Sequence, residues 1–152
     1  MKLIDTNLLV YAYVPALADH TAARRWLEQT LTDDEAVGLA WATVLGFVRV
    51  VTNHRIFKVP LLLDRAVGVV DEWLQQQAIE LVLPTPRHWT TLREMLITGQ
   101  AGGSMTTDAH LAALAREHGA TIYTTDRDFQ RFPDVRVVNP LAPLDQRART
   151  PR

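Results

Sequence analysis

The sequence predicts an α/β fold in which a central, mostly parallel five-stranded sheet lies between two layers of helices, a three-layer α/β/α arrangement. Three observations support this prediction. Short apolar runs alternate along the chain with longer segments of helical periodicity, a pattern typical of parallel sheets with helical crossovers. The chain has 152 residues, enough for one ordinary domain and too few for two. Its apolar fraction of 47% is sufficient to build a sizeable core.

The predicted strands are the short apolar runs that end at polar or turn-forming residues. They cover residues 3–4, 36–41, 79–83, 120–124 and 135–138. The first run stops at Asp5, where polar residues that favour helix starts follow directly. Pro84 ends the third run, because proline cannot donate a hydrogen bond to a neighbouring strand.

The predicted helices lie between these runs and carry apolar residues at helical spacing. They cover approximately residues 8–12, 21–31, 43–52, 64–74, 86–98 and 107–118. Segment 43–52 is rich in β-branched residues, but its apolar side chains fall on one helical face. In segment 64–74 the predicted apolar stripe consists of Val67, Val70, Trp73 and Leu74. Gly119 marks the end of the last helix.

Composition excludes several classes of site. The chain has no cysteine, so disulfides, thiolate metal sites and thiol catalysis are ruled out. The net charge of −1 indicates no global attraction to nucleic acid, so such a partner must meet a local basic patch. The amino terminus lacks the long apolar run of a signal peptide, and no segment reaches the length of a membrane span. We therefore expect a cytoplasmic protein.

Three carboxylates are expected to converge at one edge of the sheet. Asp5 follows the first strand and Asp126 follows the fourth, and parallel strands end at the same edge. Asp108 lies in the first turn of the helix that leads to the fourth strand, so it starts from that edge as well. Taken singly, these residues are better explained as a helix cap, a charge at a helix start and a turn residue, and only their combination at one sheet edge favours a metal site.

Clustered carboxylates repel one another unless a cation or raised pKa values relieve the repulsion. Oxygen-only ligands favour Mg²⁺ or Mn²⁺ over Zn²⁺. Such a site supports phosphodiester hydrolysis. The acidic constellation therefore predicts a metal-dependent hydrolase.

Three segments of the sequence resemble motifs of PIN-domain proteins. They are Leu3 to Ala12 (LIDTNLLVYA), Thr107 to Ala115 (TDAHLAALA) and Thr124 to Phe129 (TTDRDF), in the order found in that family. The resemblance implies a PIN domain over residues 1–141 and leaves residues 142–152, rich in Pro and Arg, as a flexible tail.

Within the family, the size and single domain resemble VapC-type toxins of toxin–antitoxin pairs. The resemblance implies an Mg²⁺-dependent endoribonuclease that forms a homodimer and is inhibited by a cognate VapB-type antitoxin. It makes Asp5 and Asp108 metal ligands, with Asp126 completing the acidic site directly or through a water. Asn7, Thr107 and Thr125 would position ligands or waters by hydrogen bonding, although cap and turn roles explain them equally well.

One departure from the family concerns a glutamate that usually lies early in the helix after the second strand. Gly46 stands at that position, and no acidic residue occurs from Ala36 to Leu63. The departure casts doubt on a two-metal mechanism. Asp128 is a candidate substitute, with an exposed turn position as the alternative.

Basic residues that could hold RNA phosphates are densest near residues 49–58. Arg49, Arg55 and Lys58 are the RNA-binding candidates, and a solvated loop is the alternative. The four tryptophans, which could stack on bases, are expected mainly in core or interface positions. Two other functions remain open: a PIN domain that binds RNA or protein without cleaving, and phosphotransfer through Asp5. Asn7 argues against phosphotransfer, because a site of the haloacid-dehalogenase type has a second acidic residue two positions after the first, where this chain has Asn7.

Overall fold

The computed structural model describes residues 1–143 and has the predicted α/β architecture. The strands are β1 (Lys2–Ile4), β2 (Val37–Leu39), β3 (Ile79–Leu81), β4 (Thr121–Tyr123) and β5 (Arg136–Val138). The α-helices are α1 (Thr6–Tyr13), α2 (His20–Thr30), α3 (Trp41–Val51), α4 (Leu63–Leu74), α5 (His88–Thr98) and α6 (Thr106–His118). Two short 3-10 helices, η1 (Gly103–Met105) and η2 (Arg127–Arg131), complete the fold.

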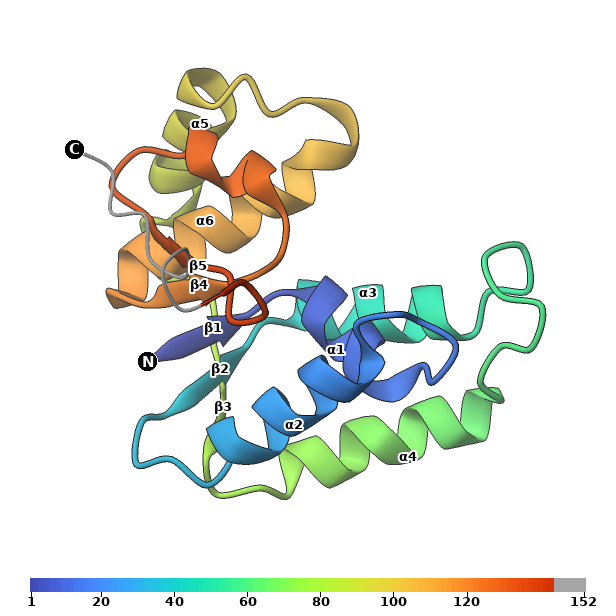
Figure 1. Cartoon of the computed structure of the whole chain (residues 1–152). Helices are drawn as coiled ribbons and strands as arrows, with labels where there is room; N and C mark the ends of the chain where they lie inside the picture. Colours follow the sequence, from blue (N-terminus) through green and yellow to red (C-terminus); the bar gives the residue numbers. More distant parts are fainter. Residues whose placement is uncertain (144–152) are drawn as a thin grey trace.

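The strands form one sheet in the order β3-β2-β1-β4-β5, and every neighbouring pair is parallel. Helices α1 to α4 lie on one side of the sheet and α5 and α6 on the other (Figure 1). Successive side chains of β1 point to opposite faces of the sheet. Leu3 packs in the core under α5 and α6, and Ile4 packs in the core under α1 to α4. The three-layer prediction is therefore confirmed.

Most predicted elements occur within two residues of their expected bounds. Segment 43–52 is helical as predicted, although α3 begins earlier, at Trp41. Gly119 ends α6 in the left-handed region with φ 61°, as its identity indicated.

The buried face of α4 was predicted only in part: Trp73 is buried and Val70 packs against the core as expected, but two residues of the predicted stripe are exposed. Val67 and Leu74 are 47% and 40% exposed, and the buried residues are Ala66, Val69 and Trp73. The helix is apolar on more than one face, so periodicity alone did not identify the packed side. Trp73 packs against Phe47 and donates a hydrogen bond from Nε1 to the Tyr13 hydroxyl at 2.9 Å.

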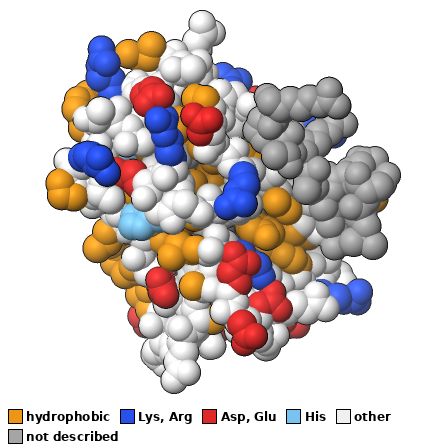
Figure 2. All heavy atoms as spheres, turned by 90° about the vertical axis from the view of Figure 1, so that its left-hand side faces the viewer, with side chains coloured by type: hydrophobic (Ala, Val, Ile, Leu, Met, Phe, Trp, Pro, Cys, Tyr) orange, Lys and Arg blue, Asp and Glu red, His pale blue; other side chains and the backbone are white. Residues whose placement is uncertain are grey.

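The surface carries charged groups of both signs among apolar ones, as Figure 2 shows for the face on the left of Figure 1. Trp26 stacks on Tyr123, whereas Trp41 and Trp89 are 47% and 67% exposed and do not belong to the core. None of the helices within residues 1–143 has the length and hydrophobicity to cross a membrane. The predicted flexible tail falls almost wholly on residues 144–152, outside the described part of the chain.

Candidate metal centre

Asp5 and Asp126 emerge at the same edge of the sheet because β1 and β4 are neighbours. Ile4 lies opposite Tyr123, and the next backbone amide, that of Asp5, donates to the Tyr123 carbonyl at 3.0 Å. This register brings Thr124 opposite Asp5, with Asp126 two residues further on. Asp5 and Asp126 therefore lie at one edge of the sheet, as the parallel topology predicts.

The Asp5 carboxylate is held from two directions. Its Oδ1 accepts a hydrogen bond from the Thr6 amide at 2.7 Å, which caps α1, and its Oδ2 accepts from the Thr124 hydroxyl at 2.7 Å. Burial raises the pKa of the Asp5 carboxyl above its ordinary value, the two hydrogen bonds lower it, and the nearby Asp126 carboxylate raises it again. The cap role and the site role therefore coexist in one side chain.

Thr124 is the hydrogen-bonding centre of the site, and it was not among the predicted site residues. Its hydroxyl donates to Asp5 and accepts from Asn7 Nδ2 at 2.9 Å and from the Asp126 amide at 3.0 Å. The side chain is 1% exposed. The sequence signal was the TTD motif, in which two adjacent threonines are indistinguishable until the strand register is known.

Asn7 presents an unsatisfied acceptor beside these groups. Its amide nitrogen is bound to Thr124, which leaves Oδ1 buried without a hydrogen-bond partner among the described residues. Buried polar atoms are rarely left unpaired, so this oxygen indicates a place for a water or a cation. Of the other predicted positioning residues, Thr107 is exposed and Thr125 half-buried, and neither side chain forms a hydrogen bond within residues 1–143.

Asp108 lies in the first turn of α6, and its pKa is affected by the other carboxylates of the site. Burial is the largest cause that raises its pKa to about 6, followed by the charges of Asp5 and Asp126. Asp128 adds to this rise, whereas Arg131 lowers the pKa. Repulsion among these carboxylates is what a divalent cation would relieve.

Asp126 is exposed and caps η2, because its Oδ1 accepts from the Asp128 amide at 2.8 Å. The Asp128 carboxylate forms an ion pair with Arg131 at 3.2 Å. Arg131 also donates to the Gly99 carbonyl, which ties this segment to the end of α5. Asp128 is therefore an exposed residue of η2 whose charge contributes to the raised pKa of Asp108.

The donor set fits a hard cation. It consists of carboxylate and amide oxygens, the ligands preferred by Mg²⁺ and Mn²⁺. Within residues 1–143, no three acidic or histidine side chains lie close enough together to hold an ion as they stand. Mg²⁺ usually keeps several of its waters, so ligation partly through water suits such spacing.

The position of the missing glutamate lies beside this site. A Cβ atom at Gly46 would meet Thr6, the residue after Asp5. Position 46 is thus adjacent to the acidic site, but Thr6 fills the space a side chain would need.

The basic candidates lie elsewhere on the surface. Arg49, at the end of α3, and Arg55 and Lys58, in the loop that follows, are exposed and form no ion pair within residues 1–143. His110, close to Asp108 in sequence, instead faces His88, with its Nδ1 2.8 Å from His88 Nε2.

Comparisons with known proteins agree with the resemblance seen in the motifs. The PIN-domain family model matches residues 2–135. Ribonuclease VapC37 of Mycobacterium tuberculosis is 42% identical over 144 residues, which cover 95% of this chain and all of that relative.

Solved structures show the same fold. VapC20 of Mycobacterium tuberculosis, described as a sarcin–ricin loop cleaving toxin, has a TM-score of 0.66 at 18% identity, covering 89% of this chain and 98% of its own. VapBC2 of Rickettsia felis, solved on a DNA fragment from its promoter, has a TM-score of 0.64 at 17% identity, covering 90% and 96%. At these identities the likeness concerns the fold alone.

Proposed function

Because the chain belongs to the PIN-domain family, we propose that it is a metal-dependent endoribonuclease that acts as the toxin of a VapBC-type toxin–antitoxin pair. The curated relatives with 40% or more identity along nearly the whole chain are named VapC ribonucleases. The observation that carries the proposal is that Asp5 and Asp126 follow neighbouring parallel strands, with Asp108 in the first turn of α6 near enough for both charges to raise its pKa. PIN-domain ribonucleases generally depend on divalent metals, which agrees with an oxygen-only site.

Asp5, Asp108 and Asp126 would hold Mg²⁺, with Mn²⁺ as a substitute, directly or through water. When bound, the ion supplies positive charge that offsets the negative charge on the phosphate oxygens. Thr124 orients Asp5, and Asn7 offers its free Oδ1 to a water or to the ion. Thr107 and Thr125 remain predicted positioning residues beside Asp108 and Asp126.

RNA is the proposed substrate, and its phosphates would contact Arg49, Arg55 and Lys58. All three are exposed cations without an intramolecular ion pair in the described part of the chain, so they are free to bind phosphate. The cytoplasm, where such an RNA substrate would be met, is the proposed location of the protein.

The proposed partners are a VapB-type antitoxin and a second copy of the chain. Large apolar side chains are exposed along α3 and around the start of α4, among them Leu45, Val59, Leu62 and Leu63 at 66%, 89%, 73% and 62%. Such exposure in one region supports protein contacts rather than an isolated monomer. Light scattering of the free protein should give the mass of a homodimer.

The function is tested by incubating purified protein with RNA in Mg²⁺, in Mn²⁺ and in EDTA. Cleavage should require the metal and should be abolished by Asp5→Asn or Asp108→Asn. Asp71→Asn is the matched control, because Asp71 is an exposed residue of α4. Unchanged metal-dependent cleavage by Asp5→Asn would disprove the mechanism.

A second candidate is a PIN domain that binds RNA or protein without cleaving. Gly46 favours it, because the usual glutamate is absent and no room remains for a side chain. Retained RNA binding without cleavage in either metal would support this candidate. Family membership disfavours the phosphotransfer alternative, for which a stable acyl-phosphate on Asp5 would be the evidence.

A further inference from the structure

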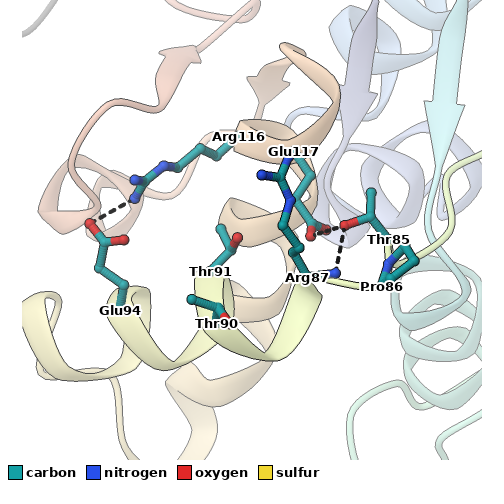
Figure 3. Close-up of a pocket in the computed structure, with 8 residues that line it drawn as sticks. All are labelled: Thr85, Pro86, Arg87, Thr90, Thr91, Glu94, Arg116 and Glu117. Atoms are coloured by element: carbon teal, nitrogen blue, oxygen red, sulfur yellow. Dashed lines mark hydrogen bonds and ion pairs between the residues drawn. The ribbon is translucent and has the colours of Figure 1, made fainter.

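A separate polar cavity lies between the start of α5 and the end of α6 (Figure 3), with a volume of about 560 Å³. It is lined by Thr85, Pro86, Arg87, Thr90, Thr91, Glu94, Arg116 and Glu117. Arg116 follows Asp108 by eight residues on α6, a rise of about 12 Å along the helix axis. The cavity is therefore distinct from the acidic site.

Both carboxylate oxygens of Glu117, which lines the cavity, already have partners. One oxygen of Glu117 accepts from the Thr85 hydroxyl at 2.5 Å, and the other lies 2.7 Å from His88 Nδ1. The Glu117 side chain is 5% exposed. Since both carboxylate oxygens are engaged, Glu117 serves as a structural support for the two helices rather than as a free acceptor.

Two arginines line the cavity, and one of them is already paired. Arg116 Nη1 forms an ion pair with Glu94 Oε1 at 2.9 Å, drawn as a dashed line in Figure 3. The Arg116 side chain is 32% exposed, so part of it remains accessible to a ligand.

Other donors face the same space. The Arg87 guanidinium has no ion pair or hydrogen bond with any residue the structure describes, and the Thr90 and Thr91 hydroxyls have none either. In Figure 3 the Arg87 and Arg116 side chains lie on the wall above the first turns of α5, where both threonines are found. The Arg87 guanidinium and the two threonine hydroxyls, all unpaired among the described residues, favour an anionic, acceptor-rich ligand.

We propose that this cavity binds the phosphate group of a nucleoside monophosphate, either free or as the 5′ end of an RNA. Guanidinium groups match phosphate oxygens in geometry and charge, so Arg87 and Arg116 would hold the phosphate and the threonine hydroxyls would donate to it. The volume falls in the range of small-ligand sites, roughly 300–1,000 Å³. The proposal does not depend on nuclease activity.

Calorimetric titration of the full chain in EDTA tests the proposal without a contribution from metal-bound ligand. The probes are adenosine monophosphate, adenosine, inorganic phosphate, and a short RNA with a 5′-phosphate or a 5′-hydroxyl. The monophosphate should bind at least about tenfold more tightly than adenosine, and Arg87→Gln or Arg116→Gln should each weaken it by a similar factor.

Two variants serve as controls. Arg93→Gln should bind as the wild type does, because Arg93 is an exposed arginine of α5 outside the cavity. Glu94→Gln should bind as tightly or more tightly, because it releases Arg116 from its ion pair.

The RNA arms separate the two sources of phosphate. Arg87-dependent binding of the 5′-phosphorylated RNA without binding of the free monophosphate assigns the site to RNA ends, and the reverse assigns it to free nucleotides. Equal affinity for the monophosphate and adenosine, together with equal affinity for the 5′-phosphorylated and the 5′-hydroxyl RNA, overturns the proposal. Wild-type affinity in both Arg87→Gln and Arg116→Gln overturns it as well.

Discussion

Gly46 of α3 faces Thr6 of α1 so closely that a Cβ atom at position 46 would lie 2.7 Å from the Thr6 hydroxyl oxygen and 3.1 Å from its Cγ2. Thr6 directly follows Asp5, so this contact borders the acidic site. Position 46, where the resemblance to the family leads us to expect a glutamate, thus has no acidic residue, and Thr6 occupies the space that a side chain would need.

Gly46→Ala should destabilise the protein. Alanine gains about 1 kcal/mol over glycine in helix propensity, but overpacking costs about 1–3 kcal/mol. We expect a net loss of about 1 kcal/mol in the free energy of unfolding, measured with urea. Adding Thr6→Ala removes the contact, so the double variant should lose less than the sum of the single losses.

Gly68→Ala is the matched control, because Gly68 lies within α4 and a Cβ atom there meets nothing within 4 Å. It should stabilise the protein by up to about 1 kcal/mol. Equal stability changes at positions 46 and 68 would contradict the predicted clash.

In the metal-free protein, the contribution of Asp108 to stability should decrease as pH rises from about 4 to 6. The pKa of Asp108 is raised from 3.8 to about 6, so the folded state binds this proton more tightly than the unfolded chain does. The stabilising effect of the proton is complete at low pH and is gone above pH 6 or so. Asp108→Asn should raise the Tm of the metal-free protein near neutral pH and leave it almost unchanged near pH 4.

Mg²⁺ should raise the wild-type Tm near neutral pH and should do so much less in Asp108→Asn, because the variant lacks one carboxylate. Thermal scans at both pH values check these expectations. If Asp108→Asn were no more stable than the wild type near neutral pH without metal, the ionised Asp108 carboxylate would not destabilise the folded protein, which would contradict the prediction.

Thr124→Val should weaken both the fold and the site. Valine has nearly the same shape but cannot donate to Asp5 or accept from Asn7, and an unsatisfied buried group costs about 1–3 kcal/mol. We expect a loss of about 2 kcal/mol in urea unfolding, with weaker Mg²⁺ binding measured by calorimetry.

Thr124→Ser should recover most of the metal affinity, because it keeps the hydroxyl. Thr125→Val should change little, because the Thr125 side chain forms no hydrogen bond within residues 1–143. Full metal affinity in Thr124→Val would show that the hydroxyl does not orient the site.

Replacing Arg49, Arg55 and Lys58 with glutamine should weaken RNA binding and its dependence on salt. Each lost phosphate contact should reduce the slope of log K against log salt by about 0.7 for single-stranded RNA. Fluorescence anisotropy on an Asp5→Asn background measures binding without cleavage. An unchanged slope would show that these three residues do not contact RNA phosphates and only face solvent.

Much of the fold could be predicted because its signals are local. The apolar run before Asp5 and the glycine after α6 mark element ends through short-range chemistry, and parallel topology then brings Asp5 and Asp126 to one edge. The packed face of α4 could not be predicted in this way. Ala66 and Val67 are adjacent in the sequence and both are apolar. Only the position of the surrounding elements decides that Ala66 is buried and Val67 exposed.

The candidate site divides in the same manner. The sequence by itself determined the three acids, their position at the carboxyl edge of the sheet and the absence of a fourth acid near Gly46. Only the tertiary structure decided that Thr124 rather than Thr125 contacts Asp5, a hydrogen bond between residues 119 positions apart. Local propensities set where strands and helices begin and end, whereas strand register and helix packing depend on the free energy of the whole core and select the side chains that meet.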